Sequence, residues 1–529
     1  MKVAIIAPPY PLAEAPAPPL GISYVAAAFL AAGAEVKIFD YIVRGYSAAK
    51  LRAELAAFTP EVVGVTSVTM NFPGAAAILT EAKRALPEAI TVMGGPHVSF
   101  TAAHTLDNHP GIDLIVMGEG EKTIAELVDA GFKSPLFPRI KGIAFRRNGQ
   151  ATVNEPRPFI PDLDELPLPA RHLLPLSRYR ALGYPISIIT GRGCPYECIF
   201  CQGRRMVGKK IRQRSTSLVV DEIAAIMSYG IDRINIADDL FVTDRKRVRE
   251  VCGEIKRRGL RLTWSAFARV NTVDRETLEI MRDTGCDSVS FGVESGNPEM
   301  LARIKKKITL EQVRRAVKIC NEVGILPHTS FVVGLPGESP QTLADTKQFA
   351  SSLGSLYGYH ILAPFPGTTV REKVSEYDLE ILTDDWTQYD ANRAVTRTSH
   401  LSPADIDAFV AEFEDAIMAG WHKQIQNYGT GANTPEEDMQ VAGHFRTQLV
   451  YRLLSEDLIE TLGSGNGAGE ENITPEMLCR RIAVRTGADA ALVDRTIADF
   501  IAKGYIKAVR RGDRHRWIWT HNNQVDIFA

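Results

Sequence analysis

The stretch GRGCPYECIFC, residues 191–201, places Cys194, Cys198 and Cys201 close together in one short segment. Iron–sulfur clusters are held by cysteine thiolates, normally by a set of four. Three thiolates at this spacing can hold such a cluster and leave one iron without a protein ligand. An open metal position can bind a small molecule, as it does in catalytic metal sites. The segment therefore predicts a reactive iron–sulfur site.

Two other uses of these cysteines are less well supported by the sequence. A structural zinc site needs a fourth Cys or His close by, and the nearest histidine is His172. A disulfide framework is unexpected in a chain with 7 cysteines and no secretory leader. The remaining cysteines stand alone in the sequence, and we expect them to pack as small buried side chains: Cys252, Cys286, Cys320 and Cys479.

Composition indicates an ordinary soluble protein with several domains. The chain has 529 residues, of which 45% are hydrophobic and 23% charged. Its net charge of −2 argues against a strong electrostatic attraction to nucleic acid or to a membrane. No apolar run is long enough for a membrane span or a signal peptide. We therefore expect a cytoplasmic protein, a location that also suits an oxygen-sensitive cluster.

Residues 1–150 alternate short β-branched runs with alanine-rich stretches, a pattern typical of a parallel sheet covered by helices. The sequence predicts a Rossmann-like or flavodoxin-like α/β domain. Most of its expected strands are nearly continuous apolar runs, as buried parallel strands are: residues 3–7, 35–39, 62–66, 90–93 and 114–117.

Polar and glycine-rich segments follow three of these strands. They are TSVT at 66–69, GGPH at 94–97 and GEGE at 118–121. Ligands of parallel α/β sheets bind beyond the carboxyl ends of the strands, and glycine lets the backbone approach a ligand closely. A nucleotide would suit such a sheet as well, but no GxGxxG fingerprint follows the first strand.

A proline-rich connector, residues 151–184, separates this domain from a second run of alternating strands and helices, residues 185–400. Six parallel strands would form a partial, TIM-like (β/α)6 barrel, with functional residues at the carboxyl ends of its strands. The expected strands are residues 186–190, 233–237, 261–266, 288–293, 328–333 and 357–362.

The CxxxCxxC spacing, with Phe200 before the last cysteine, resembles the signature of the radical S-adenosylmethionine (SAM) enzymes. In that superfamily SAM chelates the open iron of a [4Fe-4S] cluster, and the reduced cluster cleaves SAM to a 5′-deoxyadenosyl radical. The resemblance implies SAM-binding roles for Phe200, Asp238, Asp239, Arg269, Glu294, Gly334 and Leu335. Two alternatives stay open: the aspartate pair could cap the next helix, and Arg269 could form a surface salt bridge.

The segments PPLGISYVAA, GVTSVT, GGPHVSF and GEGEKT, in this order before the cysteine motif, are similar to the cobalamin-binding domains of cobalamin-dependent radical SAM enzymes. The resemblance implies contacts to cobalamin from Thr66, Ser67, Val68, Thr69, Gly94, Gly95, His97, Gly118, Glu119 and Gly120. For His97 a purely structural role is an equal alternative.

The lower face of the corrin is expected to lack a histidine ligand. The DxHxxG motif that supplies one in other cobalamin proteins is absent, and the segment around His109 is one residue short of it. We therefore predict that cobalamin binds with its own base displaced. Residues 68–71 would then lie under the corrin.

The resemblance implies a methyltransferase that acts on an unactivated carbon. One SAM would methylate reduced cobalamin, and a second would yield the radical that activates the substrate. The substrate radical would then take the methyl group from methylcobalamin. A cyclase, rearranging or hydroxylating enzyme of the same scaffold is the first alternative, and a cobalamin-responsive DNA-binding regulator is the second.

The C-terminal third lies outside this resemblance. Helical spacing predicts a helical extension over residues 401–462, starting near Ser402, and a glycine-rich linker follows from Gly463. Residues 472–529 would form a winged-helix-like module with a basic hairpin, for which docking is favoured over nucleic-acid binding. The expected partners are a small-molecule or peptide substrate and a reductant such as flavodoxin or ferredoxin.

Overall fold

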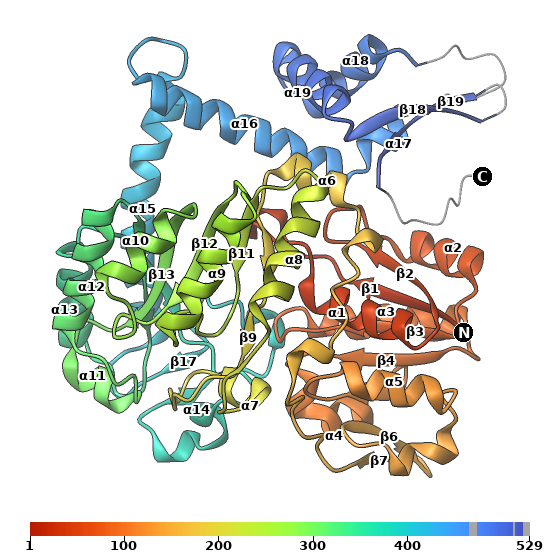
Figure 1. Cartoon of the computed structure of the whole chain (residues 1–529), viewed down its shortest axis with the longest axis horizontal. Coiled ribbons are helices and arrows are strands. Elements are labelled where there is room, and N and C mark those ends of the chain that lie inside the picture. The colour runs from red at the N-terminus through yellow and green to blue at the C-terminus, as the bar shows by residue number, and fades with distance from the viewer. Residues whose placement is uncertain (465–472, 512–513, 522–529) are drawn as a thin grey trace.

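The computed structural model describes residues 1–464, 473–511 and 514–521. Figure 1 shows a parallel-sheet domain beside an open barrel, with two long helices leading from the barrel to a small C-terminal module. The predicted α/β fold, with a parallel N-terminal sheet, a second parallel sheet and a helical C-terminal region, is confirmed. None of the described helices is long and apolar enough to cross a membrane.

The N-terminal sheet has the strand order β2-β1-β3-β4-β5-β6-β7. Its first five strands are parallel and match the expected ones: β1 (Lys2–Ala7), β2 (Glu35–Asp40), β3 (Val62–Thr66), β4 (Ile90–Gly94) and β5 (Leu114–Val116). Helices α1 (Leu20–Ala31) and α5 (Glu121–Asp129) pack on one face. The opposite face is covered by α2 (Ala48–Phe58), α3 (Phe72–Ala85) and α4 (Val98–Asn108).

Two antiparallel strands that were not predicted, β6 (Ile143–Arg147) and β7 (Gln150–Val153), extend this sheet. They form a hairpin around Asn148 and Gly149, both of which have positive φ angles of 52° and 79°. An Asn-Gly pair favours this turn, so the signal was present in the sequence. The charged residues around it obscured the short strands.

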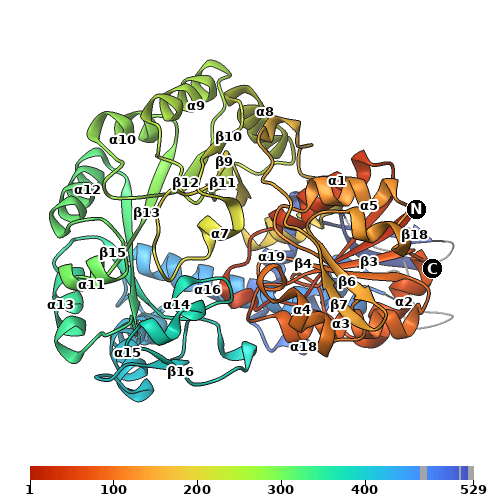
Figure 2. The same cartoon turned by 90° about the horizontal axis from the view of Figure 1, so that it is seen from below.

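The barrel sheet has the order β15-β14-β13-β12-β11-β8, and all neighbouring strands are parallel. Figure 2 shows the strands as an arc with helices outside. The strands are β8 (Ile186–Ile188), β11 (Arg233–Ile236), β12 (Thr263–Ala268), β13 (Cys286–Glu294), β14 (Leu326–Val333) and β15 (Leu356–Ile361). The outer helices are α8 (Thr216–Ser228), α9 (Arg245–Arg257), α10 (Arg275–Arg282), α11 (Pro298–Arg303), α12 (Leu310–Val323) and α13 (Pro340–Ser351).

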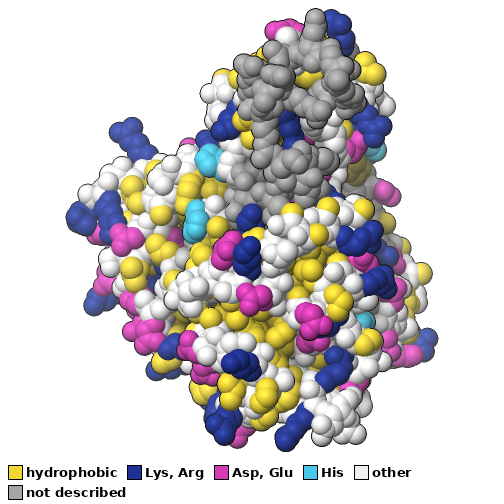
Figure 3. Space-filling view, turned by 90° about the vertical axis from the view of Figure 1, so that its right-hand side faces the viewer, with side chains coloured by type: hydrophobic (Ala, Val, Ile, Leu, Met, Phe, Trp, Pro, Cys, Tyr) yellow, Lys and Arg dark blue, Asp and Glu magenta, His cyan; other side chains and the backbone are white. Residues whose placement is uncertain are grey.

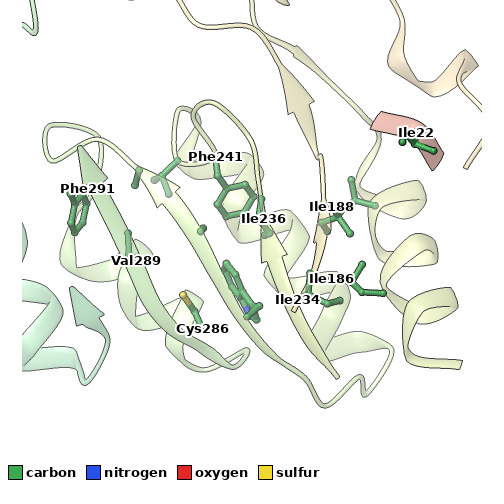
Figure 4. Close-up of a cluster of buried hydrophobic side chains, with 14 of the residues drawn as sticks. Ile22, Ile186, Ile188, Ile234, Ile236, Phe241, Cys286, Val289 and Phe291 are labelled. Carbon is green, nitrogen blue, oxygen red and sulfur yellow. The ribbon is translucent and has the colours of Figure 1, made fainter. Parts of the chain in front are cut away.

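Alternate side chains on each barrel strand point outward into an apolar core beneath these helices. Figure 4 shows Ile234 and Ile236 of β11 beside Ile186 and Ile188 of β8, with Ile22 of α1 nearby. The same hydrophobic cluster therefore continues from the barrel into the N-terminal domain. This shared core fixes the two domains against each other.

A short antiparallel ribbon projects from the barrel and carries the cysteine loop. Its strands are β9 (Gly191–Arg192) and β10 (Arg212–Gln213), and the loop between them includes the short helix α7 (Gly203–Val207). Smaller elements complete the region: α6 (Leu176–Leu182), α14 (Thr369–Glu372), β16 (Glu380–Ile381) and β17 (Thr396–Arg397).

The C-terminal region consists of helices and a final hairpin. Its elements are α15 (Pro403–Asn427), α16 (Pro435–Ser455), α17 (Leu458–Leu462), α18 (Pro475–Thr486), α19 (Ala490–Ala502), β18 (Ile506–Arg511) and β19 (Arg514–Trp519). The predicted helix start at Ser402 is confirmed by a capping box with Asp405. Within this extension the sequence predicts a second helix over residues 439–462. The structure instead has two helices there, α16 and α17, because Asp457 between them adopts a left-handed conformation.

Most of the predicted glycine-rich linker, residues 465–472, lies outside the described residues, as do residues 512–513 between β18 and β19. Figure 3 views the molecule from the side of the N-terminal domain. Basic and acidic side chains are interspersed there, and the described residues show no continuous basic patch.

Buried charges connect the C-terminal module to the N-terminal domain. The guanidinium of Arg178, in α6, is 1% exposed and donates to the carbonyl of Val43 at 3.0 Å. It also contacts Asp457 Oδ1 at 3.1 Å and pairs with Glu460. Lys50 of the N-terminal domain is a second partner of Asp457. Arg178 and Lys50 thus balance two carboxylates at this junction, and Arg178 is the only one of these two cations that contacts both.

We predict that Arg178→Met destabilises the protein by about 3–5 kcal/mol, because it leaves Asp457 and Glu460 buried with too little positive charge. Thermal unfolding followed by circular dichroism measures the effect. The control is Arg249→Met, which removes an exposed pair with Glu276 and should cost less than about 1 kcal/mol. Equal losses in the two variants would contradict the prediction.

Candidate functional site

The three cysteines of the loop lie close enough to influence one another. All are free thiols, and Cys201 is exposed. Burial raises the pKa of the Cys194 thiol, the charges of Asp239 and Cys198 raise it further, and Arg269 lowers it. Within the described parts of the chain, no three Cys, His, Asp or Glu side chains surround a point where a single metal ion could sit.

The surroundings of the loop suit thiolate ligands. The N–H of Gly203 donates to Cys201 Sγ at 3.4 Å, and Arg269 Nη1 lies 4.0 Å from Cys198 Sγ. These contacts favour thiolates, but burial outweighs them, since it raises the pKa of Cys194 and raises that of Cys201 to about 11. Ligation to a metal would remove these protons. Phe200 is half-buried against the hydrophobic core and fixes the end of the loop. Three thiolates with this support fit an iron–sulfur cluster.

The two aspartates after β11 have different environments. Asp238 is buried, and its carboxylate accepts hydrogen bonds from the N–H and hydroxyl of Thr190 at 2.6 and 2.5 Å. Burial raises its pKa to about 6. Asp239 is exposed and lines the cavity described below. Neither caps the following helix, whose N-cap is Asp244.

Arg269 lies at the end of β12 and is 7% exposed, so it does not form a surface salt bridge. Its guanidinium stacks on the ring of Tyr196 at 3.6 Å and donates to the carbonyl of Lys306. Among the described residues it has no carboxylate partner. A buried guanidinium in this state favours an anionic ligand.

Glu294, at the end of β13, has a positive φ of 74°, which is strained for a residue with a side chain. Its carboxylate is 2.6 Å from the Lys306 ammonium, and both side chains are buried. Such strain needs support from the surrounding structure and often marks a functional position.

Gly334 and Leu335 begin the loop after β14, and the Glu338 side chain fixes their backbone through hydrogen bonds. Glu338 Oε2 accepts hydrogen bonds from the N–H groups of Gly334 and Leu335, at 2.6 and 3.2 Å. Its other oxygen is buried and has no hydrogen-bond partner in the described structure. Burial raises the pKa of Glu338 to about 8. This carboxyl group is therefore mostly protonated at neutral pH.

The raised pKa makes Glu338 a source of pH-dependent stability. The folded state holds a proton that the unfolded state releases near the ordinary glutamate pKa of 4.5, so this contribution to stability falls as pH rises from about 5 to 8. Glu338→Gln keeps an oxygen for the two N–H groups. We expect the unfolding free energy of this variant minus that of the parent protein to increase by on the order of 3 kcal/mol as pH rises over this range.

Urea unfolding at pH 5.5 and 8 measures this change. Glu412→Gln, at an exposed carboxylate paired with Lys347, is the control and should show almost no pH-dependent difference. A Glu338→Gln curve parallel to that of the parent protein would contradict the assignment.

A cavity of about 410 Å³ lies between the N-terminal sheet and the cysteine loop. The N-terminal domain contributes the strand-end residues Thr66, Gly94, Gly95, Gly118, Glu119 and Gly120, all of them predicted. The loop side contributes Arg192, Met206, Val207 and Asp239. The predicted strand-end surface and the cysteine loop therefore open onto one space.

The cavity continues as an apolar slot between the sheet and helices α1 and α5. Ile5, Gly64 and Val92 of three neighbouring strands form its floor. A Cβ at Gly64 would have its nearest neighbour 4.0 Å away, so glycine leaves room here that a larger side chain would fill. Gly64 and Tyr24 lie in the segments GVTSVT and PPLGISYVAA but were not named as cobalamin contacts, although a lone glycine inside a strand often marks close approach of a ligand.

The remaining predicted residues, Ser67, Val68, Thr69 and His97, lie beside the cavity and do not line it. Val68 is 40% exposed at the strand-end surface, whereas Ser67 is buried and its hydroxyl has no hydrogen-bond partner in the described structure. Gly95 is required next to it, since a Cβ there would lie 2.4 Å from the Ser67 carbonyl. Gly95 therefore lets the ends of β3 and β4 pack closely beside the cavity, and a hydroxyl without a partner, like that of Ser67, is uncommon among buried polar groups.

His97 is 1% exposed and stacks on Phe72, with 4.3 Å between ring centroids, while Trp386 packs edge-on at 5.0 Å. Its Nδ1 lies 3.3 Å from the Thr69 hydroxyl. Burial, together with the charge of Arg371, lowers its pKa to about 4. The ring is therefore neutral and packs between the two domains. His109 also packs against Phe72, edge-on at 5.1 Å, away from the cavity.

Comparisons with known proteins agree with this arrangement. Residues 13–128 match the B12 binding domain family, and residues 188–350 match the Radical SAM superfamily. An uncharacterized methyltransferase of Pyrococcus horikoshii is 35% identical over 77% of this chain and 90% of its own length. The anaerobic magnesium-protoporphyrin IX monomethyl ester cyclase of Rubrivivax gelatinosus is 29% identical over 69% of this chain and 68% of its own.

A solved structure shares the fold. The radical SAM methyltransferase TsrM of Kitasatospora setae, with cobalamin and a [4Fe-4S] cluster bound, gives a TM-score of 0.63. The match covers 95% of this chain and 99% of TsrM at 19% identity. Fold and site together define an α/β enzyme in which a sheet domain faces a cysteine loop on a parallel barrel. The chain belongs to the cobalamin-dependent radical SAM enzyme family.

Proposed function

We propose that this protein is a cobalamin-dependent radical SAM methyltransferase that acts on an unactivated carbon. The observation that carries the proposal is the shared cavity, onto which the glycine-rich strand ends and the cysteine loop both open. A relative whose sequence aligns with this chain over 90% of its own length is named a methyltransferase. When bound, the cluster and SAM supply a radical and cobalamin supplies the methyl group.

The residues of the barrel would hold the cluster and SAM. Cys194, Cys198 and Cys201 would ligate the cluster. Of the two aspartates, Asp239 is the proposed partner of the SAM ammonium, because the carboxylate of Asp238 is already bound to Thr190. Arg269 has no carboxylate partner in the described structure and would bind the SAM carboxylate.

Three further barrel positions would contact the nucleoside part of SAM. We propose that Glu294, held by Lys306, lies near the ribose and that the backbone of Gly334 and Leu335 lies near the adenine. Glu338 keeps that backbone in place through its hydrogen bonds. Phe200 would support the loop from the core side.

The N-terminal domain would hold cobalamin at its strand ends. The apolar slot over Gly64 has room for the nucleotide tail of cobalamin. A tail bound in this slot would keep the cobalamin base away from cobalt, as the sequence predicts. Val68, exposed and apolar, would face the lower side of the corrin, where no histidine lies among the cavity residues. A neutral His97 would support this surface through its contacts with Thr69 and Phe72.

A cyclase or another radical enzyme without net methyl transfer is the second candidate, because a relative with 29% identity is named as such a cyclase. Analysis of SAM products after anaerobic reconstitution with hydroxocobalamin and a reductant separates the two. A methyltransferase is expected to form both 5′-deoxyadenosine and S-adenosylhomocysteine. Formation of 5′-deoxyadenosine alone would favour the cyclase, and formation of neither would overturn the proposal.

We further propose that the enzyme works in the cytoplasm under anaerobic conditions and receives electrons from a flavodoxin or ferredoxin. The first reason is the exposed thiol of Cys201, which oxygen would oxidise. The second is that the cluster of a radical SAM enzyme must be reduced before it can cleave SAM. The substrate would be a small molecule or a peptide.

A further inference from the structure

Two arginines of the β9–β10 ribbon reach into the N-terminal domain. Arg192 and Arg212 face each other directly across the ribbon. Arg212 binds Glu119 with two hydrogen bonds of 2.9 and 2.8 Å, and Arg192 Nη1 lies 3.2 Å from the same carboxylate. Arg192 also donates to Glu121 at 2.5 Å. We call these four side chains the ribbon clamp.

The ribbon clamp is buried and pairs two basic side chains with two acidic ones. Each of its four side chains is at most 10% exposed. Burial alone would raise the pKa of Glu119, but hydrogen bonds from Arg212 and the Ile160 N–H, with the charge of Arg192, lower it below its ordinary value. Bidentate pairing of this kind fixes orientation as well as distance. Loss of one partner would leave a buried charge unpaired.

The same clamp shapes the cysteine loop. Arg212 Nη2 donates to the carbonyl of Val207 at 2.6 Å, and the N–H of Cys194 donates to the carbonyl of Gly208 at 3.0 Å. Val207 lines the cavity, as do Arg192, Glu119 and Glu121. One hydrogen-bonded unit thus connects the first cysteine, the cavity wall and the strand end of the other domain.

This connection has a thermodynamic consequence. A cluster held by the three cysteines would stabilise one arrangement of the loop, and the ribbon clamp and the cavity wall depend on that same arrangement. Two ligands that need the same ordered segment share its entropic cost, so the first to bind makes the second bind more tightly. By linkage the effect is equal in both directions.

We propose that Arg192, Arg212 and Glu119 are positioning residues that couple cluster assembly to cobalamin binding. The proposal rests on the cofactors assigned above. It assigns the clamp a role beyond holding two domains together: the cluster-loaded enzyme binds cobalamin more tightly than the cluster-free enzyme does.

The test measures the affinity for hydroxocobalamin of the full chain, with the cluster reconstituted and with the cluster removed by a chelator. In the parent protein the cluster is expected to tighten binding by about 5-fold or more. In Arg212→Gln the two affinities should be nearly equal. Arg204→Gln is the matched control, because Arg204 lies in the same loop but pairs with the exposed Glu197 within it. It should retain the parent ratio.

A purely structural role for the clamp predicts a different pattern. Arg212→Gln would then weaken binding equally with and without the cluster and leave the ratio unchanged, which would overturn the proposal. A ratio near one in the parent protein would do the same. If Arg212→Gln does not fold, Glu119→Gln replaces it, since it keeps the volume and one acceptor oxygen.

Iron content and corrin absorbance are recorded for every sample, so the cofactor assignment is judged separately. A parent protein that binds neither a cluster nor hydroxocobalamin would refute the proposed function and the coupling together. A parent protein that binds both independently would refute the coupling alone.

Discussion

Cys198→Ala is expected to abolish cluster binding and every reaction of SAM. Three thiolates are the minimum for a cluster that keeps one iron open, and Cys198 lies between the other two in the loop, with its sulfur next to Arg269. Iron after anaerobic reconstitution should fall from about four per chain to near zero. Formation of 5′-deoxyadenosine should fall to the background of the buffer.

Cys479→Ala is the matched control for this experiment. Cys479 is a lone cysteine in α18, buried in the C-terminal module. Its variant should keep the iron content and the SAM products of the parent protein, apart from a small loss of stability. Hydroxocobalamin binding should persist in Cys198→Ala, although weakened. A cluster of normal iron content in Cys198→Ala would show that another side chain completes the site, and the radical mechanism would lose its basis.

Gly64→Leu is expected to reduce cobalamin affinity by about 100-fold or more, because its side chain would fill the slot over β3. The backbone at Gly64 tolerates a side chain, since the nearest atom to an added Cβ is 4.0 Å away. Leucine is also a better strand residue than glycine. The fold and the cluster should therefore survive while the cavity is lost.

Equilibrium titration with hydroxocobalamin measures this loss, with circular dichroism and iron content as checks on folding. Gly74→Leu is the control: Gly74 lies in α3 and has no neighbour within 4 Å of an added Cβ. It should bind like the parent protein. Unchanged affinity in Gly64→Leu would mean that the apolar slot does not receive the tail of cobalamin.

The order of strands and helices could be predicted from the sequence because it depends on local patterns. Nearly continuous apolar runs such as Val62–Thr66 are typical of central strands in a parallel sheet, and the structure has a strand there. The iron–sulfur site could likewise be predicted from the sequence, because its three cysteines lie in one short loop. The short strands β6 and β7 were missed because β6 ends in two arginines and β7 is a short mixture of polar and apolar residues.

Partners that are distant in sequence could not be predicted in this way. Asp238 and Asp239 are neighbours with the same side chain, yet one is bound to Thr190 and the other faces the cavity. Arg269 is buried beside Tyr196 and the cysteine loop, which its local sequence does not indicate. The surroundings of these side chains depend on which distant segments pack against each strand end.

The sequence by itself determined the two α/β domains, the cysteine loop and the glycine-rich strand ends, because periodicity and spacing act within a few neighbouring residues. Only the tertiary structure decided that Glu119 would pair with Arg192 and Arg212, and that Gly64 would open a slot beneath α1. Burial makes unpaired charges and misplaced side chains costly, and which groups become buried together is settled only when the two domains pack.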